Sequence, residues 1–333
     1  MDVMPKWAEI VLVPLISLLF AAGLSALVIL GIGEDPVAAV KLMVTGALGS
    51  TYGWGYTLYY ATNFMFTGLC VAVAFHARLF NIGGEGQAML GGLGVALASL
   101  YIPWPHWTLA FLNYILVNMM RPQGSMDPAT ARFPDATKLP TLHDLLSPIG
   151  INFSKAAPAN ISLLVAVAAC IFVWVLIWRT RLGYEIRAYG HSESAAKYAG
   201  ISPIKITMVT MMISGGLAGM MAINNVMGEA ERLVLNATEG AGFIGIAVAL
   251  MGRSHPLGVF LAAILFGFLY QGGAELALWT SIPRELIVVI QALVILFTGA
   301  LDNMVRMPLE KLFSAIHAAR APKPERKPVE PAE

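Results

Sequence analysis

The chain has 333 residues, of which 57% are apolar and 12% are charged, and its mean hydropathy is +0.71. Soluble domains carry about 25% charged residues, so the composition excludes an ordinary soluble protein. The apolar residues form long unbroken runs, which predict an all-α, polytopic membrane bundle and disfavour a transmembrane barrel. The net charge of +1 gives no reason to expect nucleic-acid binding.

The first apolar run, Ile10–Leu30, follows Lys6 and is followed by Glu34 and Asp35. The excess of positive charge before the run predicts a cytoplasmic N-terminus. The run is too long for the core of a signal peptide, and we expect a retained first helix.

A second predicted span, Gly55–Phe75, returns to the cytoplasmic side at His76 and Arg78. The glycine-rich segment Leu79–Gly92 then separates two apolar runs. Its polar side chains are Asn81, Glu85 and Gln87. Irregular backbone at membrane depth persists only where protein or a water-filled cavity surrounds it. The segment therefore predicts part of a translocation path or, alternatively, a polar turn at the membrane surface.

The next apolar runs do not give a consistent topology. Ala88–Ile102 predicts a third span and Ile161–Trp178 a later one, with a polar outer loop at 121–160 before it. Between them, Thr108–Met120 makes about 20 Å of helix against a hydrocarbon core of about 30 Å. If Thr108–Met120 crosses the membrane, every later orientation inverts, so we expect that it does not cross.

The longest charged interruption, Arg179–Lys205, is net basic and contains a predicted short helix. Ser192 suits the N-cap, Gly200 suits the position after the C-terminus, and Pro203 stops continuation. So short a helix is marginal alone in water and must rest on its own membrane domain or on a partner. The alternative is a solvated basic loop that only sets topology.

The rest of the chain predicts spans at Ile206–Val226, Leu257–Gly272 and Glu285–Leu301, and a shorter apolar helix at Gly242–Met251. The tail after residue 305 is charged and rich in proline. Within the first of these spans, Asn224 and Asn225 are candidates for the translocation path, because polar groups inside a membrane tend to face one. Hydrogen bonding between helices is the alternative.

No motif indicates an enzyme. The sequence lacks the GxxxxGK[ST] phosphate loop and the second histidine of HExxH, so ATP hydrolysis and a metal site are not expected in this chain.

Four motifs occur in order along the chain: LFNIGGEGQAMLGG, LGYEIRAYGHSESAAKYAGI, ISGGLAGMMA and GFIGIAVALMGRSHPLGVFLAAILFG. Together they resemble the membrane permease of bacterial ABC importers, in the family of branched-chain amino acid, ribose and nucleoside permeases. The nucleoside and simple-sugar branch is the most similar. The resemblance runs from about Ala61 to Val305.

The resemblance implies a permease that forms the path for a nucleoside or simple sugar across the bacterial inner membrane. Its implied partners are a second permease, identical or not, two cytoplasmic subunits that bind ATP, a periplasmic substrate-binding protein and membrane lipid. No cofactor is implied in this chain. The permease domain would span residues 1–305, with a cytoplasmic coupling loop at 179–205 and a cytoplasmic tail at 306–333.

The resemblance also assigns roles to single residues. Gly190–Ile201 resembles the coupling helix that docks on the ATPase. The coupling residues implied are Gly190, Ser192, Ala195, Ala196, Tyr198, Gly200 and Ile201. The residues expected to line or support the path follow instead from their polarity in or beside apolar spans, and they are Asn81, Glu85, Gln87, Asn224 and Asn225.

One departure from the family concerns the stretch that contains Thr108–Met120. A membrane crossing and its basic loop are missing there, in agreement with the inconsistent topology described above. Two alternatives therefore stay open: a secondary transporter or channel that works without ATP, and a truncated assembly subunit that does not transport.

Overall fold

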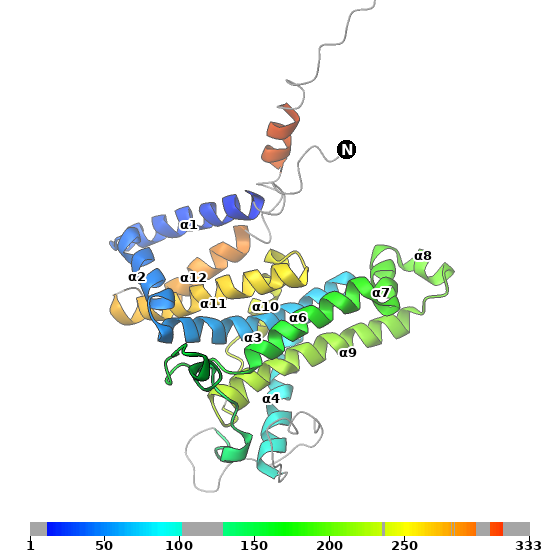
Figure 1. Ribbon diagram of the computed structural model, residues 1–333. Coiled ribbons are helices and arrows are strands. Elements are labelled where there is room, and N and C mark those ends of the chain that lie inside the picture. The colour runs from blue at the N-terminus through cyan, green and yellow to red at the C-terminus, as the bar shows by residue number, and fades with distance from the viewer. Residues whose placement is uncertain are drawn as a thin grey trace, which may run out of the picture. The chain divides into compact units, whose positions relative to one another are not determined.

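The computed structural model describes residues 12–101, 129–234, 237–280, 282, 284–297 and 307–315 (Figure 1). It divides into two compact units. One unit consists of residues 29–288, and the other combines residues 1–28 with residues 289–333. The predicted segment Thr108–Met120 and the end of the tail lie outside the described residues.

The described part of the unit of residues 29–288 consists of helices and connecting loops, with two isolated bridges and no strand. Its longer helices are α2 (Pro36–Leu48), α3 (Thr51–His76), α4 (Gly84–Tyr101), α6 (Ser162–Arg179), α7 (Arg181–His191), α9 (Pro203–Ala222), α10 (Ala241–Met251) and α11 (Pro256–Trp279). Its shorter helices are α5 (Leu142–Leu146), α8 (Glu193–Tyr198) and the π-helix η5 (Ile223–Glu229). The all-α prediction is confirmed.

Four helices among the described residues are long and apolar enough to cross a membrane, or five if α1 and α2 count as one interrupted span. The four are α3, α6, α9 with η5, and α11, and each matches a predicted span to within one residue or contains it. Helix α2 was not predicted. It begins at an N-cap, because the Asp35 carboxylate accepts a hydrogen bond of 2.9 Å from the Val37 N–H, and Pro36 suits the first helical position.

Helix α3 is the centre of this unit. Of the 18 residues in the apolar window of α3, 83% are buried. The helix packs against α11, α10, α9 and α6. Figure 1 shows α3, α6 and α9 side by side, with α4 crossing α9. A helix that is apolar on every side and surrounded by other helices is a core helix of the bundle.

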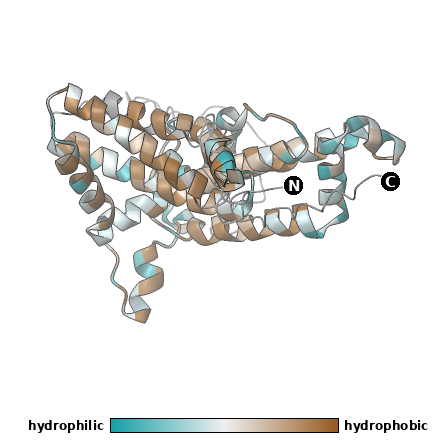
Figure 2. Cartoon of the chain, turned by 90° about the horizontal axis from the view of Figure 1, so that it is seen from above, coloured by the Kyte–Doolittle hydropathy of each residue, from teal (hydrophilic) through white to brown (hydrophobic). Residues whose placement is uncertain are grey.

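The predicted basic loop is not a loop. It forms two helices, α7 and α8, which stand at one end of the α6–α9 pair (Figure 1). Figure 2 shows hydrophilic residues gathered on this end, whereas the bodies of the long helices are apolar. The sequence analysis missed α7, although its N-cap is regular: the Thr180 hydroxyl accepts a 3.0 Å hydrogen bond from the Gly183 N–H.

Helix α8 matches the prediction closely. The Ser192 hydroxyl accepts a hydrogen bond from the Ala195 N–H at 3.3 Å, and Glu193 forms an ion pair of 2.8 Å with Lys197. Gly200 has φ +80°, and the Ile201 N–H donates to the Ala196 carbonyl at 2.9 Å. These bonds form a Schellman-type C-terminus, which favours glycine because the residue after the helix is left-handed.

The described part of the predicted outer loop is ordered by its own contacts. Thr141 and Asp144 form a capping box at the start of α5, and Thr141 also bridges to Asn160. Hydrogen bonds from the Thr141 hydroxyl and N–H hold the pKa of the Asp144 carboxyl below its usual value.

The second unit contains most of α1 (Val13–Gly31), the end of α12 (Arg284–Ile295) and a helix at 307–315. Val13 is fully buried against Ile16, Leu309 and Phe313. The predicted first helix is confirmed, and α12 begins within one residue of the predicted final span.

We predict that Gly190→Ala destabilises the protein. Gly190 is buried in α7, and a Cβ atom there would overlap the carbonyl oxygen of His76, which is backbone and cannot yield easily. Overpacking of this kind costs about 1–3 kcal/mol. Thermal unfolding in detergent should show a lower midpoint than that of the unaltered protein.

Gly216→Ala is the matched control, since Gly216 also lies in a helix but a Cβ atom there meets nothing within 4 Å. Its midpoint should stay constant or rise, because alanine favours a helix over glycine by about 1 kcal/mol. Equal midpoints for Gly190→Ala and the unaltered protein would contradict this account.

Candidate functional site

Asn224 is the centre of a buried polar network. It lies in the π-helix η5, has no exposed surface, and uses both ends of its amide. Its nitrogen donates to the Tyr59 carbonyl at 2.9 Å and to Asn63 Oδ1 at 2.8 Å. Its oxygen accepts from Asn160 Nδ2 at 3.0 Å and from the Ser162 hydroxyl at 2.7 Å. One side chain therefore joins α3, η5 and the start of α6.

Asn225 makes a second connection beside the first. Its oxygen accepts a hydrogen bond from the Tyr59 hydroxyl at 3.2 Å, and its nitrogen donates to the carbonyl of Ala237. Tyr59 is thus held at its backbone by Asn224 and at its ring hydroxyl by Asn225. The two asparagines fix both the position and the direction of this tyrosine.

Asn81 organises the irregular segment between α3 and α4. Its side chain is buried, and its nitrogen donates to Gln87 Oε1 at 2.8 Å and to the Ser214 hydroxyl at 2.7 Å. Its oxygen accepts from the Gly83 N–H at 3.0 Å. The Ser214 hydroxyl donates in turn to the Cys70 carbonyl at 2.7 Å. The network connects α3, α4 and α9 where the backbone is not helical.

Glu85 lies in the first turn of α4 and caps the N-terminus of α10. Its carboxylate accepts hydrogen bonds from the Thr238 hydroxyl, from the Gly240 N–H at 2.9 Å and from the Gly242 N–H at 2.7 Å. An anion at this position is favourable because the first N–H groups of a helix lack partners within the helix and the helix dipole is positive there. The carboxylate thereby ties α4 to α10.

The structure brings the five predicted path residues into intramolecular hydrogen-bond networks. The sequence analysis considered turn building and helix–helix bonding as alternatives for these residues, and the contacts show both. Their role in a translocation path stays a prediction.

A small cavity of about 20 Å³ lies beside the asparagine network. It has room for about one water molecule. Its lining comes from α3, η5, α10, α11 and the segment before α10. The lining residues are Tyr59, Tyr60, Asn63, Phe64, Asn225, Thr238, Glu239, Ala241 and Tyr270.

Aromatic rings form one wall of this cavity. The ring centroid of Tyr270 is 5.0 Å from that of Phe64 and 5.4 Å from that of Tyr60. Tyr60 also stacks on Phe64 at 6.4 Å, with an interplanar angle of 18°. The sequence analysis named none of these three residues, and no local pattern connects residues 60 and 270. The tyrosine-rich start of α3 was the available signal.

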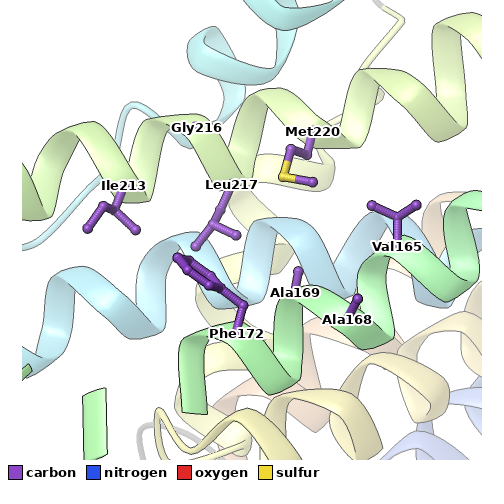
Figure 3. A pocket seen from close by; sticks show the side chains of 8 residues that line it. All are labelled: Val165, Ala168, Ala169, Phe172, Ile213, Gly216, Leu217 and Met220. Atoms are coloured by element: carbon purple, nitrogen blue, oxygen red, sulfur yellow. The ribbon is translucent and has the colours of Figure 1, made fainter. Parts of the chain in front are cut away.

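A second hollow, between α6 and α9, has a different lining (Figure 3). It is an open groove of about 410 Å³ whose eight lining residues are all apolar. In Figure 3, Phe172 of α6 lies against Leu217 of α9, and Met220 and Val165 lie farther along the groove. This lining offers no side chain that could orient a polar solute.

The predicted coupling residues divide into buried and exposed groups. Gly190 and Ala196 are buried, Ser192 is the N-cap of α8, and Gly200 supplies the left-handed residue after it. Ser192 and Gly200 define the two ends of α8, and Gly190 and Ala196 are buried in the packing of α7 and α8. In particular, only 3% of Ala196 is exposed, so it faces the protein and is not available to a partner.

Every residue of α8 except Ala196 is exposed, and Ala195 and Tyr198 are the predicted coupling residues among them. Tyr198 is 96% exposed, although it is a large aromatic residue. Ile201, just past the helix, is half-buried. The exposed group is a surface that a partner protein can reach.

The comparison with known families decides the identity. A family model described as the permease component of the branched-chain amino acid transport system matches residues 109–299, which is more than half of the chain. The chain belongs to this family. A permease component is a membrane subunit and not an enzyme, and ATP is hydrolysed by a separate subunit. The chain is accordingly a multi-pass membrane protein of a transport system, which associates with ATP-binding subunits and a substrate-binding protein.

Three relatives resemble this permease over most of its length. A glucose ABC transporter permease protein of Haloferax volcanii is 31% identical, and the alignment covers 85% of this chain and 86% of the relative. A guanosine ABC transporter permease protein of Bacillus subtilis is 30% identical, with 93% and 98% covered. A nucleoside ABC transporter permease protein of Lactococcus lactis subsp. cremoris is 30% identical, with 94% and 96% covered. No solved structure matches the chain.

We predict that Asn224→Ala lowers the stability of the permease as well as its transport. The substitution removes four hydrogen bonds, and buried polar groups of α3 and of the start of α6 lose a partner. The loss should be about 1–3 kcal/mol, seen as a lower midpoint of thermal unfolding in detergent.

Ser162→Ala is the control for this change, because it removes one of the four bonds and should cost less. Uptake lost from Asn224→Ala without any change in its unfolding midpoint would refute a structural role for the asparagine.

Proposed function

We propose that this permease is the membrane subunit of an ABC importer that carries a nucleoside or a simple sugar across the bacterial inner membrane. The main support is the similarity, over 85% to 94% of the chain, to permeases named for glucose, guanosine and nucleosides. The cavity beside Asn225 adds chemical support, since it combines aromatic rings with amide, hydroxyl and carboxylate groups. Such a lining suits a small polar solute better than an apolar one.

The translocation path in this proposal runs past the cavity. Asn225 lines the cavity, and Asn224 holds Tyr59 and Asn63, which line it too. Asn81, just before α4, and Glu85 and Gln87 in α4 support the path, since Glu85 fixes Thr238 and the start of α10. Their part is to keep non-helical backbone hydrogen-bonded next to the path.

The ATPase subunits dock on α8 in this proposal, and they bind the ATP. Ala195 and Tyr198 supply the contact, with Lys197 between them on the exposed face. A second permease, identical to this chain or related to it, and a periplasmic substrate-binding protein complete the importer. Both termini of the chain then lie in the cytoplasm.

The direct test is uptake by the assembled complex. Cells that contain the permease with its ATPase subunits, second permease and binding protein should accumulate a radiolabelled nucleoside or sugar. Accumulation should stop when the catalytic glutamate of the ATPase subunit is replaced. Uptake that is driven by an ion gradient and persists without the ATPase would favour a secondary transporter instead.

We predict that Ala195→Arg uncouples transport from ATP hydrolysis. Ala195 is exposed on α8, and a long cation in place of a methyl group prevents close approach of the ATPase. Uptake should fall at least tenfold, and less ATPase should copurify with the permease.

Ala131→Arg makes the same change at an exposed residue of the described outer loop, so copurification of the ATPase should be normal. Normal uptake in Ala195→Arg would remove α8 from the docking surface.

We also predict that residue 194 is accessible only from the cytoplasm. Ser194 is exposed on α8, and both native cysteines, Cys70 and Cys170, are buried and can be replaced. In that background, the variant Ser194→Cys should resist an impermeant thiol reagent in intact cells and react once the inner membrane is opened. Labelling from outside would mean that Thr108–Met120 crosses the membrane, and α8 would face away from any cytoplasmic ATPase.

A further inference from the structure

We propose that the cavity lined by Tyr60, Phe64 and Tyr270 is a substrate subsite that selects a nucleoside over a simple sugar, with the base against the aromatic wall. This inference rests on the proposed importer function and adds the solute class and the residues that select it. The subsite lies within the unit of residues 29–288, at the junction of α3, η5, α10 and α11.

The aromatic wall of the cavity suits the planar base of a nucleoside. Tyr60, Phe64 and Tyr270 lie with their ring centroids 5.0–6.4 Å apart, and all three line the same cavity. Aromatic faces bind nucleobases by stacking, whatever the base, because every base has a π-face. A simple sugar has no π-face; it can only place its C–H groups against an aromatic ring, so it gains less from this wall than a base does and depends more on bonds to its hydroxyl groups.

Most polar groups on the other side of the cavity are already hydrogen-bonded within the protein. The amide oxygens of Asn63 and Asn225 already accept hydrogen bonds from Asn224 and Tyr59, and the Thr238 hydroxyl donates to Glu85. These three groups are therefore already partly engaged within the protein, which suits a base with a few polar contacts at its edge better than a sugar with hydroxyls on every side.

Glu239 supplies the acceptor that is still available. Its side chain is exposed at the edge of the cavity, and within the described part of the chain no hydrogen bond or salt bridge engages its carboxylate. It is held by a left-handed backbone, with φ +46°, directly before Gly240. A carboxylate accepts hydrogen bonds from base N–H groups and from ribose hydroxyls. A nucleoside offers both kinds of donor.

The subsite is closed in this structure, since a cavity of about 20 Å³ admits about one water molecule. Tyr60 and Tyr270 are only half-buried, so these rings are the parts of the wall that can move aside. A path that opens to each side in turn must pass through such a closed state. The groove between α6 and α9 is larger, but its apolar lining has no group that recognises a nucleoside (Figure 3).

The test uses the complete importer in proteoliposomes, with saturating loaded binding protein, radiolabelled guanosine and radiolabelled glucose. Uptake is expressed per ATP hydrolysed, so that a change in assembly or in ATPase activity does not enter the result. The unaltered complex should carry guanosine at least tenfold better than glucose. Tyr270→Leu should lower guanosine uptake about tenfold, because it keeps apolar volume but removes the stacking face.

Two further variants separate the stacking face from other roles of the ring. Tyr270→Phe keeps the ring and should stay within about twofold of the unaltered protein. Phe172→Leu makes the same aromatic-to-leucine change in the apolar groove and should have no effect. If Tyr270→Leu fails to assemble, Glu239→Gln tests the subsite from an exposed position, and its guanosine uptake should fall about fivefold.

Each contrary outcome has its own meaning. Glucose carried as well as guanosine, or guanosine uptake unchanged in assembled Tyr270→Leu or Glu239→Gln, overturns the subsite and leaves the importer function standing. Failure of the unaltered complex to carry either solute overturns both the subsite and the proposed function.

Discussion

The structure depends on one constraint: a backbone group buried in an apolar bundle must be hydrogen-bonded within the protein, because no water is available there. The chain departs from regular helix between α3 and α4, in η5 and before α10, and each departure has a polar side chain that satisfies it. Asn81 binds Gly83, Asn225 binds Ala237, and Glu85 binds Gly240 and Gly242. These side chains let non-helical backbone persist within the bundle, and two of the three departures, η5 and the segment before α10, contribute to the cavity lining.

The same side chains position the cavity wall. Tyr59 shows the connection most directly, since Asn224 binds its carbonyl, Asn225 binds its hydroxyl, and its side chain lines the cavity. The same residues, Asn224 and Asn225, therefore both stabilise the fold and shape the cavity. Loss of the asparagine amide would change the fold and the cavity together, which is why stability and uptake have to be measured on the same variants.

Much of the fold was predictable, because a span needs about 20 consecutive apolar residues and leaves a direct signal in the sequence. Helix α8 was predictable from Ser192 and Gly200, whose roles at helix ends are local. Helix α7 was missed because its charged residues resemble a loop. The site was only partly predictable: the polar residues stood out from their apolar surroundings, but their partners are distant in sequence, as Glu85 and Thr238 are. The cavity joins residues 60 and 270 and left no local pattern, and the burial of Ala196 depends on how α8 packs.

Helix α9 connects α8, the docking surface of the proposed importer, with the cavity, although α8 and the cavity are far apart in sequence. Helix α9 begins directly after α8, at the Ser202 cap and Pro203, and continues into η5, which carries Asn224 and Asn225. Its 20 residues correspond to about 30 Å of continuous helix. In the proposed importer, a displacement of α8 by the ATPase would therefore be transmitted to the cavity wall along this continuous helix. At its C-terminal end, α9 changes to the π-helix η5. Short π-helical segments inside α-helices are rare and frequently occur at functional sites. Helix α9 leads into the asparagines that hold Tyr59, so the helix that follows α8 and the residues that shape the cavity are continuous in the chain.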